Sequence, residues 1–214
     1  MDRSEVFAKI EKNGVIAVIR LNDISKLEGI IDALTRGGIH ALEITMTTPD
    51  AIRIIEQLSS RYRGDFMIGA GTVLDPETAR NVILAGASFV VSPVLNTDII
   101  RMVHRYDRLM IAGAFSPTEI LSAWENGADV VKVFPATALG PKYFKDIHGP
   151  MPQVRLTPTG GVSIDNAAEF IRAGACCLGI GTALLDKKMI AASDWDGLAK
   201  RASEFVAAVK KGRS

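Results

Sequence analysis

Residues 109–134, LMIAGAFSPTEILSAWENGADVVKVF, contain one complete unit of strand, helix and strand. The apolar run Leu109–Ala114 is typical of a strand buried on both faces. Ser116-Pro117 predicts a helix start, because proline fits the first helical position. Asn126-Gly127-Ala128 predicts the end of that helix, since glycine is the usual cap there. The apolar run Val130–Phe134 then follows, so the stretch predicts two consecutive parallel strands joined by a helix.

The same unit recurs along the chain. Apolar runs begin roughly 20 to 26 residues apart, which leaves room for one strand, one helix and two short loops per repeat. The helix-ending glycine recurs at Gly38, Gly86 and Gly174. The eight predicted strands are Val15–Arg20, Ala41–Thr45, Phe66–Thr72, Phe89–Pro93, Leu109–Ala114, Val130–Phe134, Val154–Thr159 and Cys176–Gly181. We predict an α/β fold, a single-domain (β/α)8 TIM barrel with parallel strands over residues 1–214, with a doubly wound open sheet as the alternative.

Further helix starts are predicted where a proline follows a turn residue. They lie at Thr48-Pro49, Asp75-Pro76 and Gly140-Pro141. A last amphipathic helix is predicted to begin near Asp194. No linker rich in serine, glycine or proline divides the chain, which supports one domain.

The charge balance favours a protein that binds its ligands locally. Lys and Arg total 25 and Asp and Glu total 24, so the net charge is +1 and no global field would hold a nucleic acid or an acidic membrane. The first residues, Met1 to Glu5, are largely polar and lack the apolar run of a signal peptide. We therefore expect a cytoplasmic protein with no nucleic-acid or membrane partner.

The two cysteines of the chain, Cys176 and Cys177, are adjacent. They fall in a predicted strand, where successive side chains point to opposite faces. They therefore cannot supply a disulfide framework, which indicates a reducing compartment.

Lys132 stands in the middle of an otherwise apolar predicted strand, where lysine is rare. Burial disfavours the ammonium form, and a neutral amine can attack a carbonyl carbon to form a Schiff base. The structural alternative is a lysine on an edge strand, or one that extends outward between helices to reach water. The strand alone does not decide between these interpretations.

Glu43 repeats the pattern with a carboxylate inside the apolar strand Ala41–Thr45. Such a carboxyl can act as a general acid or base. It could also form an ion pair with Arg20 or Lys132 inside the barrel. Arg20 follows the first apolar run, and it could bind a carboxylate or phosphate or simply lie on a surface loop.

Glycine-rich strand ends suggest a phosphate site. Gly69–Thr72 and Gly179–Thr182 each match half of the dinucleotide-binding fingerprint, but both lack its third glycine, and close packing is the simpler explanation. Thr159, Gly160 and Gly161 end the seventh predicted strand, and Gly181 and Thr182 end the eighth. TIM barrels commonly bind phosphate at these two strand ends, through backbone N–H groups.

Other chemistries lack their motifs. The sequence has no HExxH, no spaced cysteine pairs, no GxSxG and no Walker motif. The three histidines, His40, His104 and His148, are scattered and are expected to be structural rather than metal ligands. We therefore predict no metal site.

Taken together, six motifs in order resemble the class I 2-keto-3-deoxy-6-phosphogluconate (KDPG) aldolase family, whose members often also cleave 4-hydroxy-2-oxoglutarate (KHG). The resemblance covers nearly the whole chain. The motifs are Leu42–Thr45, Gly69–Leu74, Val91–Pro93, Lys132–Pro135, Pro158–Val162 and Gly179–Thr182.

The resemblance implies a lyase of the Entner–Doudoroff pathway that forms a homotrimer, needs no cofactor and acts on a phosphorylated keto acid to release pyruvate. Lys132 would be the Schiff-base lysine and Glu43 the general acid and base. Thr72, Pro93 and Phe134 would shape the pyruvate pocket. Thr159, Gly160, Gly161, Gly181 and Thr182 would bind the substrate's hydroxyls and phosphate, with Thr182 where many relatives have serine.

One departure concerns the substrate carboxylate. Many members have an arginine where this chain has Thr47, and that arginine is assigned to the substrate's carboxylate. Other members resemble this chain in having threonine there and an arginine at the end of the first strand, so the resemblance transfers the carboxylate contact to Arg20. Residues 139–143 also resemble the phosphogalactonate aldolases, but Thr159 argues against them, because those relatives have an apolar residue before the paired glycines. A cofactor-free phosphosugar isomerase or epimerase is a further alternative, and a non-enzymatic phosphosugar-binding module is a third.

Overall fold

The computed structural model describes residues 1–21, 23–62, 64 and 66–214, and it contains one nearly closed barrel of eight parallel strands that alternate with helices. The strand order is β7-β6-β5-β4-β3-β2-β1-β8. The strands are β1 (Val15–Ile19), β2 (Ala41–Thr45), β3 (Met67–Gly71), β4 (Phe89–Val91), β5 (Leu109–Ala114), β6 (Val130–Val133), β7 (Leu156–Pro158) and β8 (Leu178–Ile180). The predicted (β/α)8 barrel is confirmed, and the open sheet is not observed.

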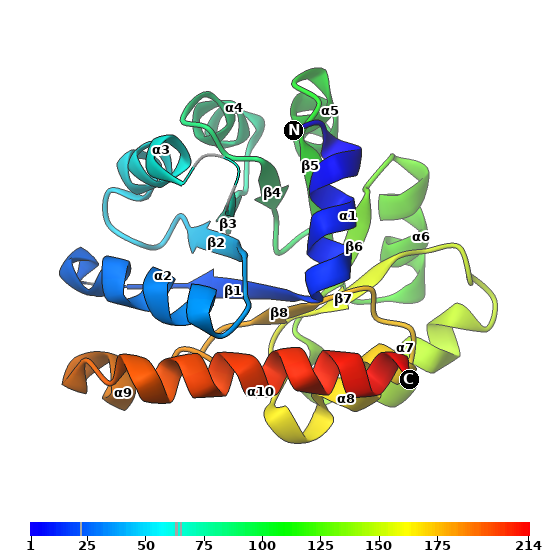
Figure 1. Cartoon of the computed structure of the whole chain (residues 1–214). Coiled ribbons are helices and arrows are strands. Elements are labelled where there is room, and N and C mark those ends of the chain that lie inside the picture. Colours follow the sequence, from blue (N-terminus) through cyan, green and yellow to red (C-terminus); the bar gives the residue numbers. More distant parts are fainter. Residues whose placement is uncertain (22, 63, 65) are drawn as a thin grey trace.

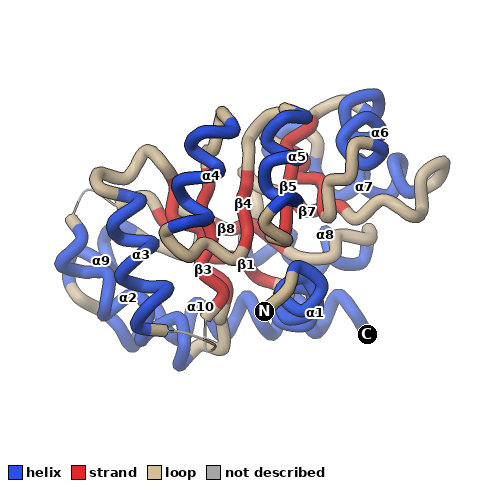
Figure 2. Tube along the Cα trace, turned by 90° about the horizontal axis from the view of Figure 1, so that it is seen from above, coloured by secondary structure: helices blue, strands red, loops and turns tan. Residues whose placement is uncertain are grey.

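The helices surround the strands, as Figure 2 shows from above. They are α1 (Arg3–Asn13), α2 (Leu27–Arg36), α3 (Ala51–Arg61), α4 (Pro76–Leu84), α5 (Thr97–Arg105), α6 (Pro117–Glu125), α7 (Gly140–His148), α8 (Ile164–Arg172), α9 (Lys187–Ala192) and α10 (Trp195–Arg213), with short 3-10 turns η1 (Ile24–Lys26) and η2 (Ala136–Ala138). None of the helices in the described part of the chain is long and apolar enough to span a membrane.

Proline placed most of the predicted helix starts correctly. Pro76 and Pro117 are the first residues of α4 and α6, and Pro141 lies in the first turn of α7. The start predicted at Thr48-Pro49 is wrong. There the amide of Thr48 donates to the carbonyl of Thr45 and closes a turn, and Asp50 is left-handed with φ 54°, so α3 begins only at Ala51.

The repeated glycine does end the helices. Gly38, Gly86, Gly127 and Gly174 all have positive φ, between 87° and 103°. This left-handed conformation is readily available to glycine, and it turns the chain from the helix back toward the next strand. After α6, for example, the amide of Ala128 donates to the carbonyl of Ala123 at 3.0 Å.

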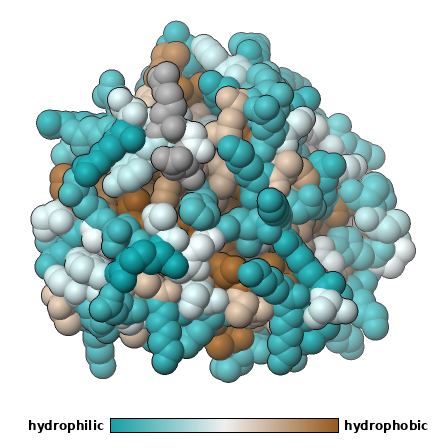
Figure 3. Space-filling view, viewed as in Figure 1, coloured by the Kyte–Doolittle hydropathy of each residue, from teal (hydrophilic) through white to brown (hydrophobic). Residues whose placement is uncertain are grey.

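The amino-terminal helix closes one end of the barrel. Val6 and Ile10 of α1 are buried against side chains that point inward from the first residues of the strands, among them Ile16, Met67 and Phe89. Figure 1 shows α1 lying across this end, and Figure 3 shows the same face as mostly hydrophilic, with small apolar areas near its centre. The barrel interior is therefore sealed by apolar packing at this end.

The prediction for the cysteine side chains is wrong. Cys176 and Cys177 lie in a bend before β8 rather than on it, and their sulfurs are 3.9 Å apart instead of on opposite faces. The strand is shorter than expected because β7 and β8 meet only at two isolated bridges, Leu156 with Ala175 and Thr159 with Gly179. Both thiols are free.

Ile10→Ala should destabilise the protein by about 2 to 5 kcal/mol, because it leaves a cavity where α1 closes the barrel. Urea unfolding followed by circular dichroism would measure the change. Lys9→Ala on the exposed face of the same helix should change stability by less than about 0.5 kcal/mol. Equal effects of the two changes would mean that α1 does not contribute to the core.

Candidate active site

Glu43 and Lys132 lie inside the barrel, one layer beyond the apolar end closed by α1. Each is two residues after an inward-facing apolar residue, Ala41 on β2 and Val130 on β6, so it points to the same side. Glu43 is 2% exposed and Lys132 is 5% exposed. The alternatives of an edge-strand lysine and of one reaching outward between helices are therefore wrong.

Glycines on β3 make the space for the carboxyl group. Glu43 pairs in register with Gly69, and any Cβ atom on Gly71 would overlap the Glu43 carboxyl. Gly69 lies just as closely against the ring of Phe89. The glycines of the motif Gly69–Thr72 thus allow close packing, which agrees with the simpler explanation of this motif.

The electrostatics of the pair follow from burial. Burial raises the pKa of Glu43 above its ordinary value, and the positive charges of Lys132 and then Arg20 oppose this rise in part. In the described part of the chain, neither cation forms an ion pair with Glu43. The structural alternative of a paired carboxylate is therefore not observed, and burial shifts the carboxyl group toward its protonated form.

Phe134 connects the buried pair to a cavity. The Nζ of Lys132 lies 5.1 Å from the centroid of the Phe134 ring. Phe134 is 37% exposed, and it lines a cavity of about 700 Å³ at the carboxyl ends of the strands. Of the predicted binding residues, the cavity wall contains Arg20, Phe134, Thr159, Gly160, Gly161, Gly181 and Thr182.

The paired glycines present their backbone to this cavity. Gly160 and Gly161 have φ of 86° and 74°, and a Cβ on Gly161 would press on Thr137. Gly179 on β8 also leaves space, because a Cβ atom there would overlap the Thr159 hydroxyl. Backbone N–H groups without side chains suit close approach to an anion.

The other predicted residues lie beside the cavity rather than in its wall. Thr72 follows β3 in a left-handed conformation with φ 59°. Pro93 follows β4, and its backbone lies against Gly113 so closely that a Cβ there would overlap it. Glu43 and Lys132 are buried, whereas Thr72 and Pro93 are partly exposed where the chain leaves β3 and β4.

The cavity wall also contains two lysines that the sequence analysis did not single out. Lys26 lies at the end of η1, where its Nζ bonds the hydroxyl of Ser193 at 2.8 Å, and Lys187 begins α9. Asp23 is the one acidic side chain in the wall described for this cavity. The sequence could have indicated Lys26 and Lys187 through their positions after β1 and after β8, since those loops meet at the predicted phosphate end.

A chain of hydroxyls follows Glu43 on β2. The Oγ1 of Thr45 lies 2.9 Å from that of Thr47 and 3.4 Å from that of Thr48, and Thr45 and Thr48 are buried. Thr47 therefore joins a cluster of hydroxyls at the end of β2 and supplies no positive charge there.

The histidines have structural partners. His104 bonds Asp129 at 3.2 Å, and the two ring nitrogens of His148 face backbone carbonyls at 3.2 and 2.9 Å. No group of three or more His, Cys, Asp or Glu residues that could hold a metal ion occurs among the described residues. The absence of a metal from the reaction stays a prediction.

Comparison with known proteins places this site in a family. The family model for KDPG and KHG aldolase matches residues 6–201. The chain belongs to this family. A 2-dehydro-3-deoxy-phosphogluconate aldolase of Pseudomonas aeruginosa is 38% identical over 183 residues, which cover 85% of this chain and 82% of the relative.

Family members with both sugar configurations are among the relatives. A 2-dehydro-3-deoxy-6-phosphogalactonate aldolase of Escherichia coli is 30% identical over 198 residues, covering 92% of this chain and 95% of the relative. The solved KDPG aldolase of Legionella pneumophila, with pyruvate captured at low pH as a covalent carbinolamine, superimposes with a TM-score of 0.85 at 31% identity. It covers 92% of this chain and 96% of that one.

Glu43→Gln should remove the loss of folding stability that accompanies ionisation of the buried Glu43 carboxyl. Because the pKa of Glu43 is raised on folding, the folded protein binds the proton more tightly, and its stability falls as pH rises above the ordinary value of 4.5. The Gln variant lacks this loss. Thermal unfolding of both proteins across acidic to neutral pH should show the variant gaining relative stability as pH rises. A difference that does not vary with pH would contradict the raised pKa.

Proposed function

We propose that this protein is a class I, Schiff-base aldolase that cleaves 2-keto-3-deoxy-6-phosphogluconate to pyruvate and glyceraldehyde 3-phosphate. The observation that carries the proposal is the amine of Lys132, which is buried, interacts electrostatically with Glu43 and lies against Phe134 in the wall of a cavity with cations and glycine loops. The same chemistry would cleave 4-hydroxy-2-oxoglutarate to pyruvate and glyoxylate. The named relatives support both the reaction class and the substrate class.

Lys132 is the proposed nucleophile. Its neutral amine attacks the C2 carbonyl carbon, the carbonyl oxygen takes one amine proton and one proton from the solvent and leaves as water, and an iminium joins substrate to enzyme. The iminium withdraws electrons from the C3–C4 bond. Lys132 is buried, so the amine and the iminium that it forms are held away from bulk water.

Glu43 is the proposed acid and base. As a carboxylate it takes the proton of the C4 hydroxyl, the C3–C4 bond breaks, and the electron pair of that bond forms the enamine of pyruvate while the aldehyde leaves. The protonated carboxyl then returns the proton to C3, and water hydrolyses the iminium to release pyruvate. A carboxyl whose pKa is raised by burial suits a group that must both accept and return a proton.

The remaining residues are proposed to hold the substrate's ends. Thr72, Pro93 and Phe134 surround the pyruvate part, and Arg20 binds its carboxylate through a forked contact. The phosphate is placed at the far side of the cavity, on the backbone of Gly160, Gly161 and Gly181 and the hydroxyl of Thr182. Thr159 hydrogen-bonds a substrate hydroxyl. The support is their common position in one cavity at the ends of β1, β7 and β8.

The resemblance supports further proposals about the protein's setting. We place it in the cytoplasm as a homotrimer in the Entner–Doudoroff pathway, acting without a cofactor. Two free thiols fit a reducing compartment. Light scattering of the purified protein would decide the oligomeric state.

A second candidate function is cleavage of 2-keto-3-deoxy-6-phosphogalactonate, a substrate that differs in the configuration of one hydroxyl. The phosphogalactonate aldolase of Escherichia coli covers this chain as fully as the phosphogluconate enzymes do. Against it stands Thr159, whose hydroxyl lies in the cavity wall before the paired glycines. A phosphosugar isomerase or a binding module on the same barrel would use the cavity without the amine.

Pyruvate with borohydride should leave a reduced pyruvyl adduct on Lys132, found by intact mass spectrometry and peptide mapping. Lys132→Ala should lose both the adduct and turnover while keeping its fold by circular dichroism. Lys26→Ala is the matched control, because this cavity lysine is held by Ser193 and should not affect the adduct. Folded wild-type protein without an adduct would overturn the aldolase proposal and favour the isomerase or the binding module.

Thr159→Val should narrow the preference between the two C4 epimers. We expect wild-type kcat/KM to favour the gluconate configuration and the variant to lose about 10-fold of that preference, since an unmade hydrogen bond in a closed site costs roughly 1 to 3 kcal/mol. Kinetics with both epimers would measure this. A wild-type preference for the galactonate epimer would assign the second function instead.

A further inference from the structure

The barrel closes between β7 and β8 through very few backbone contacts. The two strands meet at isolated bridges, Leu156 with Ala175 and Thr159 with Gly179. Between these bridges lie Thr157 on one side and Cys177 on the other. The Thr157 hydroxyl donates to the carbonyl of Cys177 at 2.9 Å, so a side chain supplies the contact that a continuous ladder would make.

A pair of thiols occupies this gap. The sulfur of Cys176 lies 3.9 Å from that of Cys177, and the Cys177 thiol lies 3.4 Å from the Thr157 hydroxyl. Cys177 is fully buried in the apolar end of the barrel, whereas Cys176 is partly exposed. The bend before β8 therefore brings two neighbouring thiols together, one inside the barrel and one at its surface.

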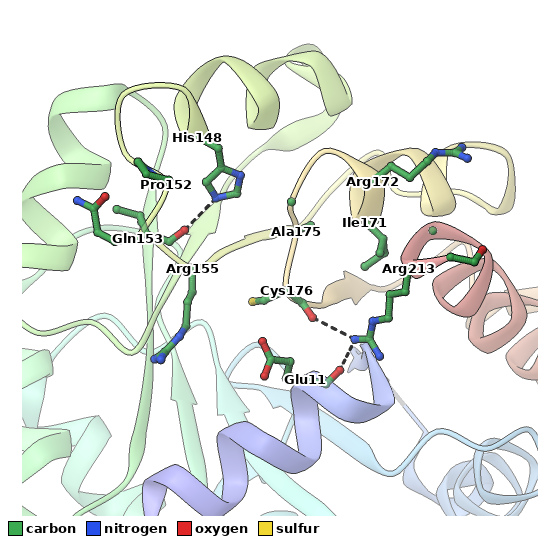
Figure 4. Close-up of a pocket in the computed structure, with 14 residues that line it drawn as sticks. Glu11, His148, Pro152, Gln153, Arg155, Ile171, Arg172, Ala175, Cys176 and Arg213 are labelled. Carbon is green, nitrogen blue, oxygen red and sulfur yellow. Dashed lines mark hydrogen bonds between the residues drawn. The ribbon is translucent and has the colours of Figure 1, made fainter.

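Cys176 lines a second cavity, on the face opposite the proposed active site. This cavity has a volume of about 810 Å³ and lies where α1, α8 and the end of α10 meet the β7–β8 gap. Figure 4 shows the Cys176 sulfur on the side of Glu11, while the Cys176 carbonyl faces Arg213. Arg213 donates to the backbone carbonyls of Glu11, Lys12 and Cys176 and so fixes this wall. Cys176 is partly exposed and lines this cavity, so of the two thiols it is the one that a small oxidant would meet first.

We propose that Cys176 and Cys177 form an oxidative modification site, in which peroxide joins the two thiols as a disulfide and thereby slows the reaction at Lys132. The Cys176 sulfur attacks one oxygen of hydrogen peroxide and the O–O bond breaks. The products are a sulfenic acid on Cys176 and one molecule of water. The Cys177 thiol then attacks that sulfur and expels a second water. Two thiols and one hydrogen peroxide thus give one disulfide and two waters.

The link to the active site runs through Thr157. Thr157 is the register partner of Lys132 on β6, and both side chains are buried. A disulfide between adjacent residues closes a small ring that includes their peptide, so the backbone at Cys177 must change. The Thr157 contacts with Cys177 change with it, next to the lysine. Small displacements of a catalytic group cost rate strongly.

The test is oxidation of the intact protein with hydrogen peroxide, followed by mass spectrometry and aldolase kinetics. Because the chain has only two cysteines, an internal disulfide appears as a loss of two hydrogens, about 2 Da, without dimerisation. Hydrogen bonding to Cys177 and burial raise the pKa of the Cys176 thiol, so the oxidation is followed as a time course. We expect the loss of mass together with a fall in kcat of roughly 10-fold, both reversed by dithiothreitol.

Cys176→Ser is the matched control. It removes the outer thiol but not the buried one, and it should keep normal kcat before and after peroxide and show no loss of mass. Dimers, added oxygen in place of the 2 Da loss, or an unchanged mass would each overturn the modification site. A disulfide that leaves kcat unchanged would overturn its link to Lys132. The mass readout does not depend on aldolase activity, so its failure is distinct from failure of the proposed function.

Discussion

The burial of two ionisable side chains, Glu43 and Lys132, inside one barrel is the constraint on which the rest of the structure depends. Among the described residues neither group has an ion-pair partner, so neither is fully compensated for the loss of water. The surrounding fold must therefore supply stability elsewhere. It does so with the apolar layer beneath them, where α1 closes the barrel, and with the apolar packing between strands and outer helices.

The same constraint explains the distribution of small residues around the barrel interior. Gly71 leaves space for the Glu43 carboxyl, Gly113 lets the chain after β4 come close, and Gly179 leaves space for the Thr159 hydroxyl. Each glycine faces a polar group or a bend at the carboxyl end, whereas the opposite end is filled by large side chains such as Phe89 and Met67. The interior thus changes from filled to open along the strand direction, and the open end is where a substrate can enter.

Much of this could be predicted from the sequence, because a single charge in an apolar strand is conspicuous. The bounds of β2 and β5 follow from local pattern alone, whereas the inward position of Lys132 was left open by its strand and is decided by the closed barrel. The ends of β7 and β8 could not be predicted, since their length depends on how the barrel closes, and apolar composition continues beyond the paired residues. Lys26 and Lys187 were missed for a related reason: only the meeting of two distant loops brings them to one cavity.

The short β7 and β8 have consequences at both ends of the barrel. At the carboxyl end, the chain leaves the ladder early, and the glycines after the two strands line the cavity. At the amino end, the chain before β8 bends instead of pairing, which brings the sulfurs of Cys176 and Cys177 together. Between the two ends, Thr157 and Thr159 contribute side-chain contacts where backbone pairing is thin. An incomplete closure therefore gives this barrel an open binding end, and it makes the same seam the part of the wall where a local chemical change can reach the buried lysine.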